Sequence, residues 1–187
     1  MCATFQLAFD ENIFDMKNIA NQLTEKYGSN FSAQQKTNFF PKGNAPVIGK
    51  NNKVSLLRWG FPMANSSKVV FNARSDSLEK KPMFNSILSN RCIVPATCYY
   101  EWGTVNNKKA KFTVAVNNLP LFYMAALWEK VQRTDEVTNF CFTIITTEPN
   151  EEIINIHNRM PAILTPQTAQ DWLSNVQRCH LFNKKWW

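Results

Sequence analysis

The first two residues of the chain, Met1 and Cys2, could carry unusual chemistry. If Met1 is removed, a free α-amine and a thiol stand on the same residue. A free α-amine has a pKa of about 7.8, so roughly a seventh of it is neutral at pH 7, whereas a lysine amine at about 10.4 is almost wholly protonated. The α-amine is therefore the better nucleophile toward an aldehyde, and the thiol could then close on the imine carbon to give a five-membered thiazolidine. A frayed chain end without function is the alternative interpretation of Cys2.

Glu101 and His157 could assist with proton transfer, although each has a plain structural alternative. Glu101 lies in the segment Tyr99-Tyr100-Glu101-Trp102, where aromatic neighbours could desolvate the carboxyl and raise its pKa into the range of a general acid. Strand alternation could equally turn Glu101 to solvent. His157 can move protons near neutral pH, and Arg159 beside it suits phosphate. A histidine at a helix end is the structural alternative for His157.

Polar and aromatic residues in the middle of the chain could contact nucleic acid. Asn72 and Arg74 fall on the same face of a predicted strand because side chains alternate, and polar decoration of an edge strand is the alternative. Aromatic side chains beside a basic groove suit unpaired bases. The candidates for this stacking are Trp59, Phe61, Tyr99, Tyr100 and Trp102. Most aromatic residues in a chain with 13% of them should instead lie in the core.

The elements that must position these residues are mostly predicted strands. A helical apolar period over 13–27 predicts a helix that Gly28 ends, and the polar segment 29–52 predicts an irregular connection. Residues 106–108 and 117–120 have the composition of hairpin turns. Short helices are expected over 76–88, 149–156 and 166–173. Strand formers gather in the segments 68–74, 91–94, 97–102, 111–116, 121–129 and 139–146. This order predicts an α+β fold with a mainly antiparallel, barrel-like core and a few short flanking helices.

Composition bounds the class of protein. The chain has 187 residues, of which 44% are hydrophobic, so we expect one domain over residues 1–187. The net charge of +7 makes a polyanionic partner plausible. The N-terminal segment has no signal-peptide pattern and no segment is long enough for a membrane span, which favours a cytoplasmic protein without membrane contact. The 5 cysteines and 2 histidines show no metal-ligand spacing, so we expect no disulfide framework, no metal and no cofactor.

Several short motifs in order give a resemblance to a known family. They are Met1-Cys2, Asn72-Ala73-Arg74-Ser75, Arg91-Cys92-Ile93-Val94-Pro95-Ala96, Tyr100-Glu101-Trp102 and His157-Asn158-Arg159-Met160-Pro161. Each motif is weak singly, but their order over nearly the whole chain is specific. The chain resembles the SOS-response-associated peptidases, the proteins that shield abasic sites in DNA.

The resemblance implies a role for each matching residue. Cys2 is similar to the family's crosslinking nucleophile, exposed after Met1 is removed, and Asn72 to the residue that positions that terminus. Glu101 resembles the carboxyl that protonates the sugar as its ring opens, and His157 the histidine that assists the imine steps. Trp59, Arg74 and Arg159 match positions that line the DNA groove. The implied function is a monomeric enzyme of the DNA damage response that crosslinks abasic sites in single-stranded DNA, with lyase-like imine chemistry and autoproteolytic removal of Met1.

The chain departs from the family pattern near its nucleophile. The family usually begins Met-Cys-Gly-Arg, whereas Ala3 and Thr4 follow Cys2 here, so one basic phosphate contact is missing. Cys98 stands where a glycine is expected, and the segment from Trp59 to Pro62 is one residue short. Two other functions stay open at this point. One is a cysteine peptidase that acts on peptides, and the other is a non-catalytic module that binds single-stranded nucleic acid.

Overall fold

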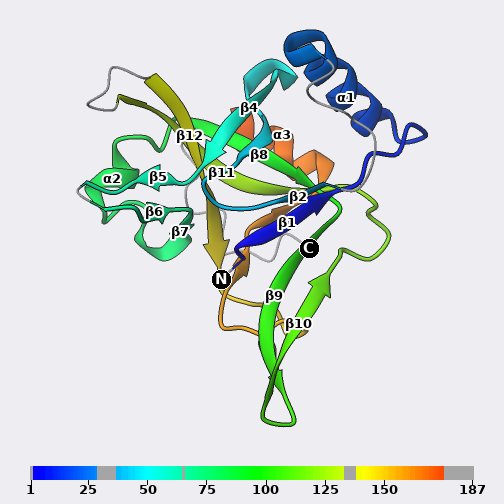
Figure 1. Ribbon diagram of the computed structural model, residues 1–187, viewed down its shortest axis with the longest axis vertical. Helices are drawn as coiled ribbons and strands as arrows, with labels where there is room; N and C mark the ends of the chain where they lie inside the picture. The colour runs from blue at the N-terminus through cyan, green and yellow to red at the C-terminus, as the bar shows by residue number, and fades with distance from the viewer. Residues whose placement is uncertain (1, 29–36, 65, 133–137, 175–187) are drawn as a thin grey trace.

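A closed circuit of strands forms the centre of the molecule (Figure 1). The computed structural model describes residues 2–28, 37–64, 66–132 and 138–174. The circuit runs β12–β4–β3–β8–β11, and β11 pairs with β12 to close it. Its strands are β3 (Asn44–Ile48), β4 (Val54–Trp59), β8 (Arg91–Ala96), β11 (Phe122–Gln132) and β12 (Thr138–Thr147). The neighbouring strands are antiparallel except for the parallel pair β4–β12.

A second sheet in the order β10–β9–β1–β2 lies beside the barrel. It contains β1 (Thr4–Leu7), β2 (Thr37–Phe39), β9 (Cys98–Val105) and β10 (Lys108–Val114). The β9–β10 hairpin projects from the molecule, as the lower part of Figure 1 shows. Asn106 and Asn107 turn the chain there with φ of 48° and 60°, a left-handed conformation that asparagine tolerates well. The hairpin predicted from these residues is confirmed.

Short helices flank the sheets. The helix α1 (Phe14–Tyr27) buries Met16, Ile19 and Leu23 on one face, and Gly28 ends it with φ of 67°. The helix α3 (Pro166–Ser174) begins with the proline that the sequence placed at its first turn. No helix in the described part of the chain is long and apolar enough to cross a membrane.

Several very short elements complete the structure. They are β5 (Phe61–Pro62), β6 (Val69–Val70), β7 (Asn72–Arg74), β13 (Met160–Pro161), β14 (Ile163–Leu164), the helix α2 (Pro82–Asn85) and the 3₁₀ helices Lys50–Asn52 and Ser75–Ser77. Strand β7 pairs in parallel with β12, in the register Asn72 to Ile144 and Arg74 to Thr146. Together these elements give the predicted α+β fold with its mainly antiparallel barrel.

The segment 29–52 is more regular than its composition predicted. Within its described residues, β2 and β3 are strands, and β3 belongs to the barrel despite Pro46. Proline is tolerated in a strand where no ladder bond needs its missing N–H. Strand β3 pairs with β8 at Ile48 alone, so that neighbour requires no donor from Pro46. The expectation of an irregular connection is therefore wrong for residues 44–48.

Three smaller expectations also need correction. The segment 149–156 is no helix, since residues 151–156 form consecutive turns and the Asn150 side chain accepts from Ile153 N at 3.0 Å. The segment 76–88 holds only the short α2 and part of one 3₁₀ helix. Residues 117–120 do make a turn, with Asn118 at φ 60° and an antiparallel bridge between Val116 and Leu119, but the pairing stops there because β10 and β11 belong to different sheets.

Candidate active site

Cys2 lies inside the molecule, immediately before β1. Its side chain is 0% exposed, and its Sγ is 3.5 Å from the carbonyl oxygen of Thr4. The Asn72 side chain donates through Nδ2 to the Cys2 carbonyl oxygen at 2.8 Å. This bond joins the start of the chain to β7, which β12 holds in place. The structure therefore brings together Asn72 and Cys2, as the sequence predicted.

The Cys2 thiol is in a poorly solvated environment. Burial is the main cause that raises its pKa to about 12, and the negative charge of Glu101 adds to the effect. A thiol with this pKa holds its proton throughout the physiological range. Cys2 is thus a neutral thiol rather than a thiolate in this state.

Glu101 is buried close to Cys2. Its side chain is 3% exposed, and its Oε1 accepts from the backbone N–H of Trp102 at 3.4 Å. Glu101 and Tyr99 share one face of β9 because side chains alternate along a strand. Burial raises the pKa of the Tyr99 hydroxyl, and the neighbouring acidic groups of Cys2 and Glu101 act in the same direction. Cys2, Tyr99 and Glu101 therefore form one buried cluster.

Two polar atoms at this cluster are available to a bound molecule. The Tyr99 hydroxyl and Asn72 Oδ1 are buried and have no hydrogen-bond partner within the described part of the chain. Buried polar groups are normally paired, so such groups call for an explanation. A polar substrate atom beside Cys2 would supply the missing partners.

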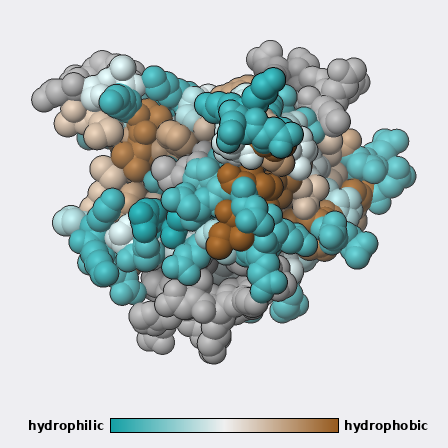
Figure 2. Space-filling model, turned by 90° about the horizontal axis from the view of Figure 1, so that it is seen from below, coloured by the Kyte–Doolittle hydropathy of each residue, from teal (hydrophilic) through white to brown (hydrophobic). Residues whose placement is uncertain are grey.

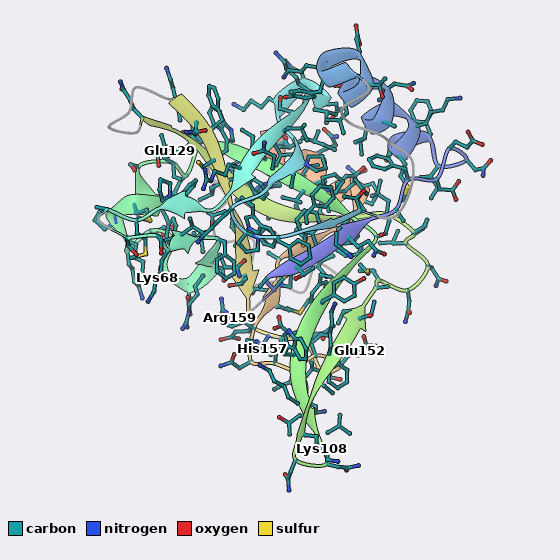
Figure 3. The ribbon with its side chains drawn as sticks, viewed as in Figure 1. Lys68, Lys108, Glu129, Glu152, His157 and Arg159 are labelled. Atoms are coloured by element: carbon teal, nitrogen blue, oxygen red, sulfur yellow. The ribbon has the colours of Figure 1, made fainter. Side chains whose placement is uncertain are left out.

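His157 reaches the same region from the turns that precede β13. Its Nδ1 lies 3.0 Å from the Arg159 backbone nitrogen and 3.1 Å from the Arg159 carbonyl oxygen, and these two contacts fix the position of the ring. Figure 3 shows that His157 and Arg159 lie close together beside β9. Gly103 of β9 permits this approach, because a Cβ there would lie 3.1 Å from the Ile156 carbonyl oxygen. The residue before His157 therefore packs directly against the strand that carries Glu101.

The two predicted arginines differ in their surroundings. Arg74 is exposed and donates to Asp76 through Nε at 3.1 Å and a terminal nitrogen at 2.6 Å. These bonds hold the pKa of Asp76 below its usual range. Arg159 is 7% exposed, donates to the Thr146 carbonyl oxygen at 2.5 Å and lies 3.8 Å from Asp76. Asp76 therefore lies between the two guanidinium groups, and the sequence alone did not predict this contact.

An aromatic and basic surface covers the outer face of the β9–β10 hairpin. Trp102 is 51% exposed, and Lys109 lies 5.1 Å from the centre of its ring. Lys111 lies 3.9 Å from the ring centre of Tyr100, which pairs with Thr4 across the sheet. Figure 2 views the molecule from this hairpin end and shows hydrophobic groups surrounded by hydrophilic ones. The alternation of β10 could have identified these lysines, which were missed.

Trp59 is a core residue in this structure. Its side chain is 0% exposed, its Nε1 donates to the Phe71 carbonyl oxygen at 2.8 Å, and its ring stacks on Phe142 at 6.1 Å. A ring enclosed in this way offers no face to a DNA base. We therefore assign Trp59 to the barrel core and leave it out of the proposed groove.

The family model for the SOS response associated peptidases matches residues 1–183. The chain belongs to this family. A related protein of Bacillus subtilis, the abasic site processing protein YoqW, is 35% identical over 183 residues, which cover 93% of this chain and 80% of the relative. The abasic site processing protein YoaM of the same organism is 36% identical over 186 residues, covering 93% of this chain and 79% of YoaM.

A solved structure supports the fold of the family. The crystal structure of a protein from Bacteroides thetaiotaomicron is 28% identical to this chain with a TM-score of 0.78. The match covers 97% of this chain and 86% of that protein. The two chains therefore share the same overall fold.

Proposed function

We propose that the protein processes abasic sites by binding single-stranded DNA and forming a covalent thiazolidine with the opened deoxyribose through Cys2, once Met1 has been removed. The observation that carries the proposal is the buried cluster in which Asn72 anchors the Cys2 backbone and Glu101 lies close to its thiol. The names of the relatives YoqW and YoaM, both abasic site processing proteins, support the same substrate.

The reaction that fits these residues has three steps. Glu101 protonates the ring oxygen of the deoxyribose, and the opened sugar exposes an aldehyde. The α-amine of Cys2 attacks the aldehyde carbon and water leaves, which gives an imine. The Cys2 sulfur then bonds to the imine carbon, and the thiol proton passes to the nitrogen to complete the ring. His157 serves the proton transfers of the imine steps.

The protonation state of Cys2 favours this order of events. Burial holds the pKa of the Cys2 thiol above its usual range, so the thiol keeps its proton near pH 7. A thiol that rarely ionises is a poor first nucleophile, so the amine attacks first. The retained thiol proton is the one that the ring nitrogen requires in the last step. The same property weakens the alternative of a cysteine peptidase, which would need a thiolate to attack a peptide bond.

DNA is held in this proposal by the charged and aromatic groups around the cluster. Arg74 and Arg159 bind phosphates, and the Trp102 and Tyr100 rings with their adjacent lysines follow the flanking strand. Removal of Met1 by the protein itself, assisted by Asn72 and Glu101, belongs to the same proposal. The chemistry can also run backward, since imine steps are reversible.

Blocking the α-amine tests the proposed function. A variant that retains one additional residue before Cys2 keeps the thiol and the DNA-binding groups but has no terminal amine at Cys2. We expect it to bind abasic single-stranded DNA and to form no covalent product, with or without borohydride reduction. A heat-stable product from this variant would show that another group attacks the sugar.

A further inference from the structure

A hollow in the surface lies away from the Cys2 cluster, where the barrel meets the end of α1. It encloses about 530 Å³, within the range of cavities that hold small ligands. Its wall comes from β3, β4, β8, β11 and β12 together with the end of α1 and the turn between β3 and β4. Residues that line it include Lys26, Lys50, Lys53, Asn90, Trp128 and Phe140.

The charge of this cavity has one sign. Among its described lining residues there are lysines and one arginine but no aspartate or glutamate. The turn 49–53 brings Lys50 and Lys53 together, since Gly49 N donates to the Lys53 carbonyl oxygen at 3.0 Å. Neither lysine has an ion-pair partner within the described part of the chain. An anion that enters the cavity would therefore meet unneutralised ammonium groups.

Another part of the wall is aromatic. The Phe140 ring is 47% exposed and lies 6.1 Å from the Trp128 ring. Phe140 continues the β12 face that carries the buried Phe142, but it lies outside the core. An exposed aromatic ring beside positive charge suits a ligand with both a flat ring and an anionic group.

We propose that this cavity is a nucleotide site, in which a base stacks on Phe140 and the phosphate contacts Lys50 and Lys53. Asn90 and Ser55 are placed in the wall to hydrogen-bond the base or sugar. Lys26 is held toward the cavity by its bond to Ser55 Oγ at 3.0 Å. The same chemistry could come from a free mononucleotide or from one nucleotide of a bound DNA strand, and it does not depend on the chemistry of Cys2.

Calorimetry with deoxyadenosine monophosphate tests the site directly. We expect the intact protein to bind it, the variant with Lys50→Gln and Lys53→Gln to bind about tenfold or more weakly, and Phe140→Ala to lose about fivefold or more. Phe140→Tyr should restore binding because it keeps the ring. The matched control is Lys80→Gln with Lys81→Gln, which removes the same charge from two exposed lysines outside both the cavity and the proposed DNA surface and should leave nucleotide binding unchanged.

An undamaged single-stranded oligonucleotide distinguishes the two sources. If it displaces the mononucleotide from Cys2→Ala protein, the site holds part of the strand, and if it does not, the ligand is a free nucleotide. The proposal fails if correctly folded protein binds no mononucleotide at millimolar concentration, if inorganic phosphate binds equally well, or if the lysine and phenylalanine variants bind as the intact protein does. Crosslinking at Cys2 is measured in parallel, so failure of this site and failure of the proposed function give different results.

Discussion

The carboxyl of Glu101 shows what a single sequence can and cannot predict about a residue. The aromatic neighbours in the sequence suggested a desolvated acid, but alternation along a strand allowed either face. The structure places Glu101 on the buried face, where it pairs across the sheet with Phe112 and lies near Cys2. Which side of β9 faces the core depends on its pairing with β1 and β10, and no local sequence pattern specifies that pairing.

Replacement of Cys2 separates the amine from the thiol. In Cys2→Ser and Cys2→Ala the terminal amine remains, provided that Met1 is removed, so an imine still forms with an abasic site. No stable ring can close without the sulfur. We expect a product trapped by borohydride but none that survives heating without reduction, as measured on denaturing gels. A heat-stable product in either variant would rule out the thiazolidine.

Glu101 and His157 should have separable effects on the reaction. Glu101→Gln keeps the size of the side chain but cannot donate a proton, so we expect crosslinking about 100-fold slower or more, with DNA binding nearly intact. His157→Ala should instead slow the imine steps, including release of a preformed crosslink. The rates are measured with an ordinary abasic site and with a substrate whose aldehyde is already open.

The pre-opened substrate decides between separate roles and a shared step. It bypasses ring opening, so it should restore much of the rate to Glu101→Gln and little to His157→Ala. Equal responses of the two variants would mean that Glu101 and His157 act as one unit on the same step.

At the scale of elements, the site depends on the parallel pairing of β7 with β12. This pairing places Asn72 within hydrogen-bond distance of Cys2 and sets Arg74 beside Thr146, near the end of β12. The Thr146 carbonyl oxygen also accepts a hydrogen bond from Arg159. The sequence predicted a strand over 68–74 and placed Asn72 and Arg74 on one face. It could not predict the pairing, because β7 and β12 are far apart in the chain and such contacts leave no local periodicity.

The exposed Arg74 should contribute to the salt dependence of DNA binding. Each neutralised phosphate on a single strand changes the slope of log K against log salt by about 0.7, so Arg74→Ala should flatten the slope by about that amount. Arg74→Lys keeps the charge and is the control. Thr4→Arg should steepen the slope, since Thr4 supplies no charge at the start of β1. Fluorescence anisotropy at several salt concentrations measures the slope for each variant. An unchanged slope would place the substituted position, 74 or 4, outside the groove.

Asp76 should restrain DNA binding in the free protein. Its carboxylate occupies the Arg74 guanidinium and lies near that of Arg159, as a phosphate would. We expect Asp76→Asn to tighten binding to single-stranded DNA and to steepen its salt dependence. Glu79→Gln removes the same charge from a nearby exposed position and should have little effect. Weaker binding in Asp76→Asn would mean that Asp76 orients the arginines for DNA rather than competing with it.

At the scale of the whole molecule, the sequence predicted the class of fold better than it predicted which strands close the barrel. Three of the five barrel strands, β8, β11 and β12, were expected near their observed bounds, whereas β3 and β4 were not, and short turns indicated an antiparallel arrangement. The part played by β3 was missed because Pro46 and the polar residues before it resemble a loop. Burial of Trp59 was missed for a related reason, since an aromatic residue suits a DNA groove and a barrel core equally well by type.

Intact mass spectrometry is the most direct test of the central claim. The protein is incubated with a single-stranded oligonucleotide that contains one abasic site, heated, and weighed beside a sample with the undamaged oligonucleotide. The account predicts a heat-stable species whose mass is that of the protein without Met1 plus the oligonucleotide less one water, with the linkage at Cys2. An unchanged protein mass, or an equally heat-stable adduct in Cys2→Ala, would contradict it.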